Sequence, residues 1–523
     1  MRQVKSFTSN ILNRQMSMYF LMKRETRSKC NQIKKTTMKQ ILIFTVAILL
    51  FGACKKDLGN YEYNPPSEPT IYNLKDTTIN AVVGDTLTIN PKVTFPDADP
   101  LKDLKFEWEI EIQEELRSIK ISGYPLKMLY NLGTGVRRTK LHVTDQRNGL
   151  KYTIPFKING TTQFTTGTIV LSVDNGVTKL SFIRPDKSVI SNLYEGLNGK
   201  VLPINPLQLY HSKPLPYQPN NKEEIWVLCD DPAKESVILD GSTLLYRNPF
   251  STQFFKTPSS INIGRIEGIQ DMGIVAHGTI NNKLYRGIMS TAPFVPDYGK
   301  FANSQDGDYL LSPDYALIFG QNNTGQSSSF YFGFDTKAKA FVSFDSGGEY
   351  RGTDYVLDNS ISQPNSFDPR NIGPVQLLYM KPASGISYAF VKDAAGNIQE
   401  LSFRIAMENY ATRTLSPIYK RSFKGSSLVN PETKWQRSAV SVFYFSSNDK
   451  IYRYNPVNED LVLLEGTYNG KKVTMLKLSA DGTQLRAGYE GAILTLDVSV
   501  GKNGNITQTQ TGIQGSVIDQ VIK

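Results

Sequence analysis

Short runs of alternating apolar and polar residues, the pattern of half-buried β-strands, recur through residues 68–160. The runs are Thr77–Val83, Thr86–Ile89, Leu104–Ile112, Thr139–Thr144 and Tyr152–Ile158. Turn-forming clusters separate them, for example Gly84-Asp85 and Gln146–Gly149. About seven short strands in so short a segment are typical of a β-sandwich, and we predict one over 68–160.

Residues 161–523 show almost no helical periodicity. They repeat one unit instead, which is an apolar strand, a turn with Asp, Asn or Gly, and a second strand rich in Tyr, Leu or Phe. The unit recurs at 168–183, 224–239, 273–288, 329–344, 386–403, 441–456 and 474–498. A hairpin period of roughly fifty residues is that of propeller blades. We therefore predict an all-β protein in which a β-propeller of about seven blades follows the sandwich.

The last repeat begins only 33 residues after the one before it. Its sequence, Met475–Asp497, indicates a strand, an Asp481-Gly482 turn, a strand, a Glu490-Gly491 turn and a final strand. Because a ring must join its ends, we expect a strand from one terminus to complete the blade begun at the other. The alternative is two or three further β-sandwiches, which would show no recurring hairpin unit.

The first 53 residues differ from the rest in charge. The whole chain carries 59 Lys and Arg against 48 Asp and Glu, a formal net charge of +11, which alone would favour a polyanionic partner. Ten of the basic residues and one acidic residue lie before residue 54, which leaves 49 against 47, a net charge of +2. The remaining sequence has no basic patch with interleaved aromatics, so we expect no nucleic-acid partner.

An apolar stretch, Ile41–Phe51, ends at Gly52, Ala53 and Cys54. It is shorter than the ~20 residues of a membrane-spanning helix and has the length of a secretory signal core. Its end resembles a bacterial lipobox, with Phe51 where leucine is commonest. The resemblance implies that 1–53 is a leader cleaved after Ala53 and that Cys54 carries a diacylglycerol thioether and palmitate. Residues 1–37 are either an over-long amino-terminal region or lie upstream of a true start at Met38.

Residues 54–67 contain a proline pair and no periodicity, which indicates an extended tether. The charged residues after Cys54 resemble the surface-export signals of lipoproteins in glycan-foraging Gram-negative bacteria. They imply an outer membrane location facing the cell exterior rather than the periplasm. With Cys30 in the leader and Cys54 lipidated, Cys229 is the remaining cysteine and no intramolecular disulfide is expected. It lies in an apolar run and is predicted to be a buried, inert thiol.

Several residues of the predicted sandwich resemble those of polycystic-kidney-disease (PKD)-type immunoglobulin-like domains. They are Gly84-Asp85, Asp97-x-Asp99-Pro100, Trp108 and Val143-Thr144-Asp145, although Glu109-Ile110 follow Trp108 where the family usually has Asp-Phe-Gly. Trp108 is predicted to pack between two sheets. Asp97, Asp99 and Asp103 are candidate Ca²⁺ ligands, because hard cations take several loop oxygens. We favour turn formation for these aspartates.

Catalytic patterns are nearly absent from the sequence. His142, His211 and His277 lie far apart, and no Cys cluster, phosphate loop or GxSxG elbow occurs, so we predict neither a metal nor a cofactor. Paired carboxylates for glycoside hydrolysis have candidates beside turn residues, namely Asp230-Asp231, Asp306 with Asp308, and Glu459-Asp460. We interpret them as solvated loop acids and assign no catalytic residue.

Exposed Trp and Tyr side chains are the remaining functional signal, because an amphipathic ring contacts a sugar ring while polar neighbours bind its hydroxyls. Trp226 lies in an apolar run and is predicted to belong to the core. Trp435 lies among charged residues in PETKWQRS and is the better candidate for exposure and for contact with a ligand. Tyr298 and Tyr350, in predicted loops, are the further ligand-binding candidates.

The lipobox, the start DLGNYEYN, the PKD-like sandwich and the long β-rich region together resemble the PKD-like family lipoproteins, which occur beside TonB-dependent starch-utilisation-like uptake pairs. The resemblance implies a non-enzymatic outer membrane lipoprotein that binds a glycan or peptide through its propeller, with the sandwich as spacer. Its partners would be a TonB-dependent transporter and the transporter's surface lipoprotein. Two alternatives stay open. One is a propeller-type glycoside hydrolase or lyase, recognised by paired inward carboxylates, and the other is an adhesion or scaffold lipoprotein.

Overall fold

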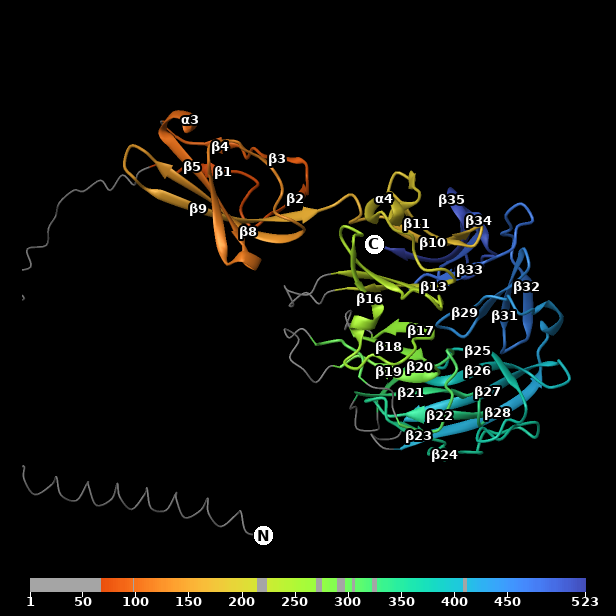
Figure 1. The fold of residues 1–523 in the computed structure, drawn as a ribbon. Coiled ribbons are helices and arrows are strands. Elements are labelled where there is room, and N and C mark those ends of the chain that lie inside the picture. The colour runs from red at the N-terminus through yellow and green to blue at the C-terminus, as the bar shows by residue number, and fades with distance from the viewer. Residues whose placement is uncertain are drawn as a thin grey trace, which may run out of the picture. The chain divides into compact units, whose positions relative to one another are not determined.

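The computed structural model describes residues 67–96, 98–213, 223–269, 275–288, 297–302, 306–321, 327–407 and 412–523 (Figure 1). Ala53 and Cys54, the predicted cleavage and lipidation positions, lie outside these residues together with the rest of the leader and nearly all of the tether. No helix of the described part is long and apolar enough to cross a membrane. Contacts group Thr94–Ala98 with a unit that reaches to Thr70, whereas Ile71–Val93 and Asp99–Lys523 form a second unit.

The region of the predicted sandwich forms one five-stranded sheet and two strand pairs. The larger sheet has the order β2-β9-β8-β5-β6 and contains β2 (Thr78–Val82), β5 (Leu104–Ile112), β6 (Arg117–Ser122), β8 (Gly135–Asp145) and β9 (Lys151–Thr161). The pairs are β3 (Thr86–Ile89) with β7 (Leu126–Leu129), and β1 (Thr70–Ile71) with β4 (Val93–Thr94). Strand β2 runs parallel to β9, whereas β5, β8 and β9 are antiparallel.

Strand β5 shows why this region buries a core. Every second residue from Leu104 to Ile112 is buried, because successive side chains of a strand point to opposite faces. Trp108 has no exposed surface, its indole Nε1 donates to the Gly123 carbonyl at 2.8 Å, and its ring meets Phe156 edge-on at 5.9 Å. The prediction that Trp108 is a core residue is confirmed.

The predicted aspartate loop is a capped turn. The Asp99 carboxylate accepts the Leu101 backbone N–H at 3.0 Å and caps helix α3 (Pro100–Asp103), while Asp103 accepts the Asp99 N–H at 2.9 Å. The turn-forming interpretation is therefore confirmed for Asp99 and Asp103, and Asp97 lies outside the described residues. Among the residues that the structure describes, no group of three or more His, Cys, Asp or Glu side chains is placed to hold a metal ion.

From residue 206 to 463 the strands form five separate sheets in chain order. The first holds β13 (Pro206–Ser212), β14 (Glu224–Cys229), β15 (Val237–Asp240) and β16 (Tyr246–Pro249), and the second holds β17 (Ile263–Gly268), β18 (Ala276–Ile280) and β19 (Lys283–Arg286). The third holds β20 (Ala316–Gln321), β21 (Ser327–Asp335), β22 (Ala340–Phe344) and β23 (Tyr350–Gly352). The fourth holds β25 (Gln376–Met380), β26 (Gly385–Lys392), β27 (Ile398–Met407), β28 (Arg413–Ser422) and β24 (Val356–Leu357), and the fifth holds β29 (Trp435–Arg437), β30 (Phe443–Ser447), β31 (Lys450–Asn455) and β32 (Asp460–Leu463). Short helices between strands are η1 (Gln113–Glu115), α4 (Leu193–Asn198), η2 (Phe250–Gln253) and η3 (Ser426–Leu428).

A six-stranded sheet joins the two ends of this series. Its order is β12 (Val189–Ile190), β11 (Val177–Ile183), β10 (Thr168–Asp174), β35 (Asn505–Ile522), β34 (Gln484–Asp497) and β33 (Met475–Leu478). The carboxy-terminal strand β35 pairs antiparallel with β10, so that Ile522 lies opposite Thr168, and Figure 1 shows blue β34 and β35 beside yellow β10 and β11. The expected closure by a terminal strand is confirmed.

The closing sheet occupies two blade positions, because β33 contacts β29 at one end of the series and β35 contacts β13 at the other. With the five separate sheets, the described residues give seven blade positions, and the all-β class with a propeller is confirmed. Each of the seven predicted repeats falls on a hairpin: β10–β11, β14–β15, β18–β19, β21–β22, β26–β27, β30–β31 and β33–β34. The last interval is short because that hairpin uses the first strand of its blade instead of the second.

One predicted turn is wrong. Glu490-Gly491 does not end a strand but forms a bulge inside β34, with a register shift between Glu490 and Ala492 and a positive φ of 83° at Gly491. Glycine serves both purposes, since it adopts the left-handed conformation that a bulge or a turn requires. The bulge lets β34 pair with β33 at its start and with β35 at its end.

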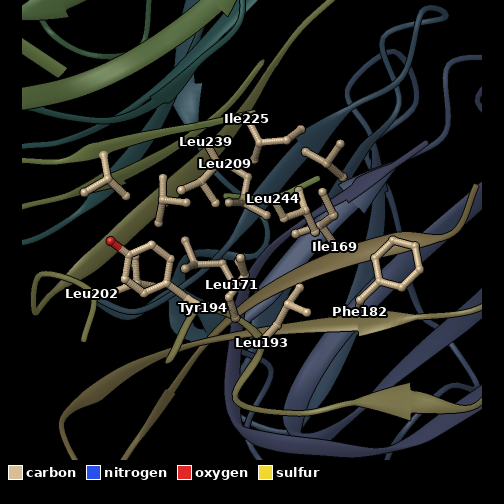
Figure 2. Close-up of a cluster of buried hydrophobic side chains, with 14 of the residues drawn as sticks. Ile169, Leu171, Phe182, Leu193, Tyr194, Leu202, Leu209, Ile225, Leu239 and Leu244 are labelled. Atoms are coloured by element: carbon tan, nitrogen blue, oxygen red, sulfur yellow. The ribbon is translucent and has the colours of Figure 1, made fainter. Parts of the chain in front are cut away.

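Neighbouring sheets pack through apolar side chains. Figure 2 shows the cluster between β10–β11 and β13–β15, with Ile169, Leu171, Phe182, Leu193, Tyr194, Leu202, Leu209, Ile225, Leu239 and Leu244 labelled. Cys229 belongs to this cluster, and burial, aided by the charge of Asp231, raises the pKa of its thiol to about 12. Trp226 is also fully enclosed. Both the inert thiol and the core tryptophan are thus confirmed.

Candidate functional site

Charged side chains gather on the innermost strands of the propeller. The first strand of one sheet contacts the first strand of the next, as β13 does with β17 and β29 with β33. Since blades approach each other most closely around the central axis, these strands line the centre. We use the name inner-strand cluster for five residues on or beside them: Arg265 and Glu267 of β17, Asp314 before β20, Lys381 after β25, and Arg437 of β29.

Arg265 holds the two carboxylates of the cluster. One of its terminal nitrogens lies 2.5 Å from Glu267 Oε1 and the other 3.7 Å from Asp314 Oδ1. Asp314 follows Pro313 in the connection to β20, and it accepts a hydrogen bond from the Met380 backbone N–H. The three charged side chains lie deep among protein atoms, yet 28%, 27% and 22% of their surfaces reach solvent. The cluster is therefore accessible as well as enclosed.

The environments of the two carboxyls push their pKa values in opposite directions. Burial raises the pKa of Asp314 to about 6, against the attraction of Arg265. Burial also acts to raise the pKa of Glu267, but the charges of Arg265 and Lys381 outweigh it and hold that pKa below its ordinary value. At neutral pH both groups are ionised, and in mildly acidic solution Asp314 takes up a proton first.

Two cations of the cluster have no carboxylate partner within the described residues. Lys381 forms no ion pair there, and burial lowers the pKa of its ammonium group. Arg437 donates to the Ser441 hydroxyl at 2.8 Å and more weakly to the Ile386 carbonyl, and burial likewise lowers its pKa. Three cations thus face two carboxylates. A positive surplus at a partly enclosed site favours a ligand with anionic groups.

His277 lies opposite Glu267 of the cluster, on the neighbouring strand β18. It is buried in β18, its Nδ1 lies 2.5 Å from the Tyr315 hydroxyl, and its ring meets Tyr331 at 5.2 Å. Burial lowers the pKa of His277 to about 4, so the imidazole is neutral at pH 7. It is a satisfied core histidine. The other two histidines pair elsewhere, His142 with Glu109 and His211 with Glu223.

Trp435 is the clearest correction to the predicted site. Its exposed fraction is 8%, and its ring stacks on Tyr379 at 5.6 Å, Phe390 at 4.7 Å and Phe445 at 4.9 Å. The expectation that Trp435 is exposed is therefore wrong, because strand β29 turns the ring into the core between two sheets. The argument for ligand contact depended on exposure and loses its basis. Instead, Trp435 packs against Tyr379, which lies on β25, the strand that Lys381 follows.

Tyr298 and Tyr350 are both half-buried, in agreement with partial access. The predicted loop position of Tyr350 is wrong, because Tyr350 begins β23, the outermost strand of its sheet, where it stacks on Tyr309 at 4.5 Å. Neither tyrosine belongs to the inner-strand cluster. Their contact with a ligand stays a prediction.

Four of the six carboxylates singled out from the sequence have turn or ion-pair contacts. Asp231 accepts the backbone N–H groups of Ile204 and Ala233, and Asp308 pairs with Lys337. Glu459 pairs with Arg421 at 3.2 Å and Asp460 with Arg453 at 3.3 Å. These contacts agree with the interpretation as loop acids.

The residues that matter most were missed. The available signal was a charged residue on or beside the strand that precedes four of the hairpins, as in Arg265 and Glu267 of INIGRIEGI. Such charges at alternating positions also describe any strand with one solvated face. Only closure of the ring brings Arg265, Asp314, Lys381 and Arg437 together.

Comparison with known proteins identifies the amino-terminal part. Residues 54–206 match the PKD-like family, a segment that begins at Cys54 and extends into the first strands of the propeller. No curated protein matches the chain. The match covers less than half of the sequence, so it describes this segment.

Several solved structures are similar to the chain at low identity. A quinonprotein alcohol dehydrogenase-like protein from Bacteroides thetaiotaomicron is 13% identical, with a TM-score of 0.34, covering 87% of this chain and 99% of that one. The periplasmic gluconolactonase of Pseudomonas aeruginosa is 12% identical, with a TM-score of 0.33, covering 68% and 99%. A functionally unknown protein from Desulfotomaculum acetoxidans is 12% identical, with a TM-score of 0.35, covering 68% and 98%. The propeller assignment itself comes from the strand pairings of this chain.

Proposed function

We propose that this chain is a lipid-anchored outer membrane protein that captures an anionic glycan or peptide for a TonB-dependent uptake system without transforming it. The observation that carries the binding role is the pair of cations, Lys381 and Arg437, without a carboxylate partner in the described residues. A partly buried cation gains a charge-assisted hydrogen bond when an anionic ligand arrives. The sequence around Cys54 supports the anchor and the surface location, and the resemblance to PKD-like family lipoproteins supports the transporter partner.

The arrangement of the carboxylates favours binding over catalysis. Glu267 and Asp314 share one guanidinium, that of Arg265, which binds one oxygen of Glu267, attracts one oxygen of Asp314 from 3.7 Å, and would compete with a substrate for both carboxylates. The neighbouring imidazole of His277 is neutral and already bonded to Tyr315. A catalytic acid or base must instead reach the proton it transfers.

A binding array tests the proposal. The full-length chain is applied to an array of glycans and peptides, and every hit is repeated with the double variant Lys381→Gln/Arg437→Gln. Each lost charge-assisted bond is worth about 1.5–3 kcal/mol, so we expect at least a tenfold loss of affinity. The exposed Lys392→Gln serves as the matched control and should bind as the unaltered chain does. Unchanged binding by the double variant would contradict the assignment of the inner-strand cluster as the binding site.

The anchor has its own test. Incorporation of radiolabelled palmitate into the unaltered chain and its absence from Cys54→Ala are expected. Label that persists in Cys54→Ala would refute lipidation at this residue.

A second function, that of a glycoside hydrolase or lyase, is favoured by one specific observation. Glu267 on β17 and Asp314 before β20 have pKa values displaced in opposite directions, as an acid and its ionised partner require. In that case products accumulate from an array hit and Asp314→Asn abolishes them. Recovery of the hit intact from the unaltered chain would exclude this function.

A further inference from the structure

A polar pocket of about 480 Å³ lies within the closing sheet, apart from the inner-strand cluster. One wall comes from β10, β11 and the turn Arg184–Lys187, and the opposite wall comes from β34 and the first half of β35. The bulges in β34 and β35 let these long strands pair at one end with each other and at the other with β33 and β10. The space between the β10–β11 part of the closing sheet and the part formed by β34 and the first half of β35 is thereby left open.

The charged side chains that line the pocket are all basic. Arg486 projects from β34, is half-buried, and has no hydrogen-bond or ion-pair partner in the described part of the chain. Burial alone lowers the pKa of its guanidinium, with no opposing anion. Lys187 donates to the side chain of Gln508 at 3.3 Å, and Arg184 to Gln163 at 3.1 Å. These cations therefore bond to neutral groups.

Two neighbouring groups reduce the positive charge of the pocket lining without cancelling it. Asp186, beside Arg184, uses its carboxylate to accept the backbone N–H and the hydroxyl of Ser188, and it does not line the pocket. Lys523, which does line it, pairs through its ammonium with Glu223. Three cations of the lining, those of Arg184, Lys187 and Arg486, therefore have no carboxylate partner among the described residues.

Gln520 is an independent sign of a missing ligand. It lies on the inner half of β35 and lines the pocket with an exposed fraction of 3%, and its amide nitrogen Nε2 has no hydrogen-bond partner among the described residues. An unsatisfied buried donor costs about 1–3 kcal/mol. A ligand oxygen in the pocket would remove that cost.

The rest of the lining indicates the ligand class. Threonine and glutamine side chains from several strands can form hydrogen bonds in the pocket, and none of the described lining residues is aromatic. A neutral sugar would lack the stacking surface that usually holds it, whereas a sugar acid has a carboxylate for Arg486 and Lys187 and hydroxyls for the amides. We propose that this pocket binds the carboxylated sugar unit of an acidic glycan. The inference rests on the proposed capture function and gives it a ligand class and a second site.

Isothermal titration of the full-length chain with digalacturonate, and with galactobiose as the neutral counterpart, tests the pocket. We expect binding of digalacturonate only, weakened at least tenfold in Arg486→Gln. Arg138→Gln, an exposed arginine of the sandwich, is the matched control and should change affinity less than twofold. Gln520→Leu should also weaken binding about tenfold while leaving the urea midpoint equal or higher, since it removes an unsatisfied donor. A merely structural glutamine would instead lower the midpoint.

The outcomes separate this inference from the proposed function. Absent binding of digalacturonate, equal binding of both sugars, or unchanged affinity in Arg486→Gln and Gln520→Leu would overturn the pocket. If the Lys381→Gln/Arg437→Gln variant alone loses its array ligand, the capture function stands and the pocket fails. If only the Arg486 and Gln520 variants lose digalacturonate, the pocket stands and the inner-strand cluster fails.

Discussion

The opposite titrations of Asp314 and His277 give the sharpest test of the inner-strand geometry. In Asp314→Asn the amide keeps its place beside Arg265 and the Met380 N–H but cannot ionise. The folded pKa of Asp314 is about 6 against an ordinary value of 3.8. A raised folded pKa means that the folded state binds the proton more tightly, so this carboxyl adds stability that is complete below pH 3.8 and lost as the pH rises through 6.

The difference of about two between these pKa values, at ~1.36 kcal/mol each, corresponds to about 3 kcal/mol in full. About 2 kcal/mol of it develops between pH 7 and pH 4. His277 acts in the opposite sense, because its folded pKa of about 4 lies below the ordinary 6.5. It contributes stability above pH 6.5 that is lost as the pH falls towards 4, about 3 kcal/mol. The two effects nearly cancel in the unaltered chain.

The assay is urea unfolding at several pH values between 4 and 7, followed by the fluorescence of Trp226 and Trp435, both buried in the propeller. The free energy of unfolding of the unaltered chain minus that of Asp314→Asn should rise by about 2 kcal/mol from pH 7 to pH 4. For His277→Gln the same difference should fall by about 3 kcal/mol. Differences that stay constant with pH would refute the burial of both groups on which the site is built.

Three further predictions concern the scaffold. Glu400 is wholly buried and accepts from Arg421 at 2.8 Å and from two tyrosine hydroxyls, so Glu400→Ala should cost about 3–5 kcal/mol in urea unfolding, and a cost under 1 kcal/mol would contradict this network. Cys229 has a pKa of about 12 against an ordinary 9.0, so iodoacetamide at pH 8 should alkylate it about a thousandfold more slowly in the folded chain than in the unfolded chain. Peptide mass spectrometry measures both rates, and equal rates would disprove its burial. In Gly515→Ala the new Cβ would lie 2.1 Å from the Val173 carbonyl oxygen, at a φ of +72°. We expect the free energy of unfolding of the propeller, measured by thermal unfolding, to fall by about 1–3 kcal/mol, and an unchanged transition would argue against this closure.

The propeller can be predicted well from the sequence because each repeat of apolar runs and turn residues corresponds to one hairpin of the structure. Hairpins in which turn residues separate two apolar strands form from neighbouring residues, so each of the seven repeats is found where it is expected. Trp108 and Trp226 lie in alternating or apolar runs, and their burial follows from that pattern. Strand β6 escaped prediction because its side chains are mostly exposed, and only pairing with β5 makes it a strand.

The candidate site is a product of closure and could not be predicted in the same way. Arg265, Asp314, Lys381 and Arg437 are separated by roughly one blade repeat each, so no local window contains two of these blades. Trp435 misled for the same reason. Its charged sequence neighbours indicated solvent, whereas the rings that cover it come from β25, β26 and β30.

The most direct test of the capture function is the fate of a ligand retained by the inner-strand cluster. An array hit is incubated with the full-length chain, and the bound and free fractions are analysed by mass spectrometry. We expect intact ligand in both fractions, and a bound fraction that falls at least tenfold in Lys381→Gln/Arg437→Gln but not in Lys392→Gln. Cleaved ligand, or retention that is indifferent to the double substitution, would contradict a binding protein that works through these cations.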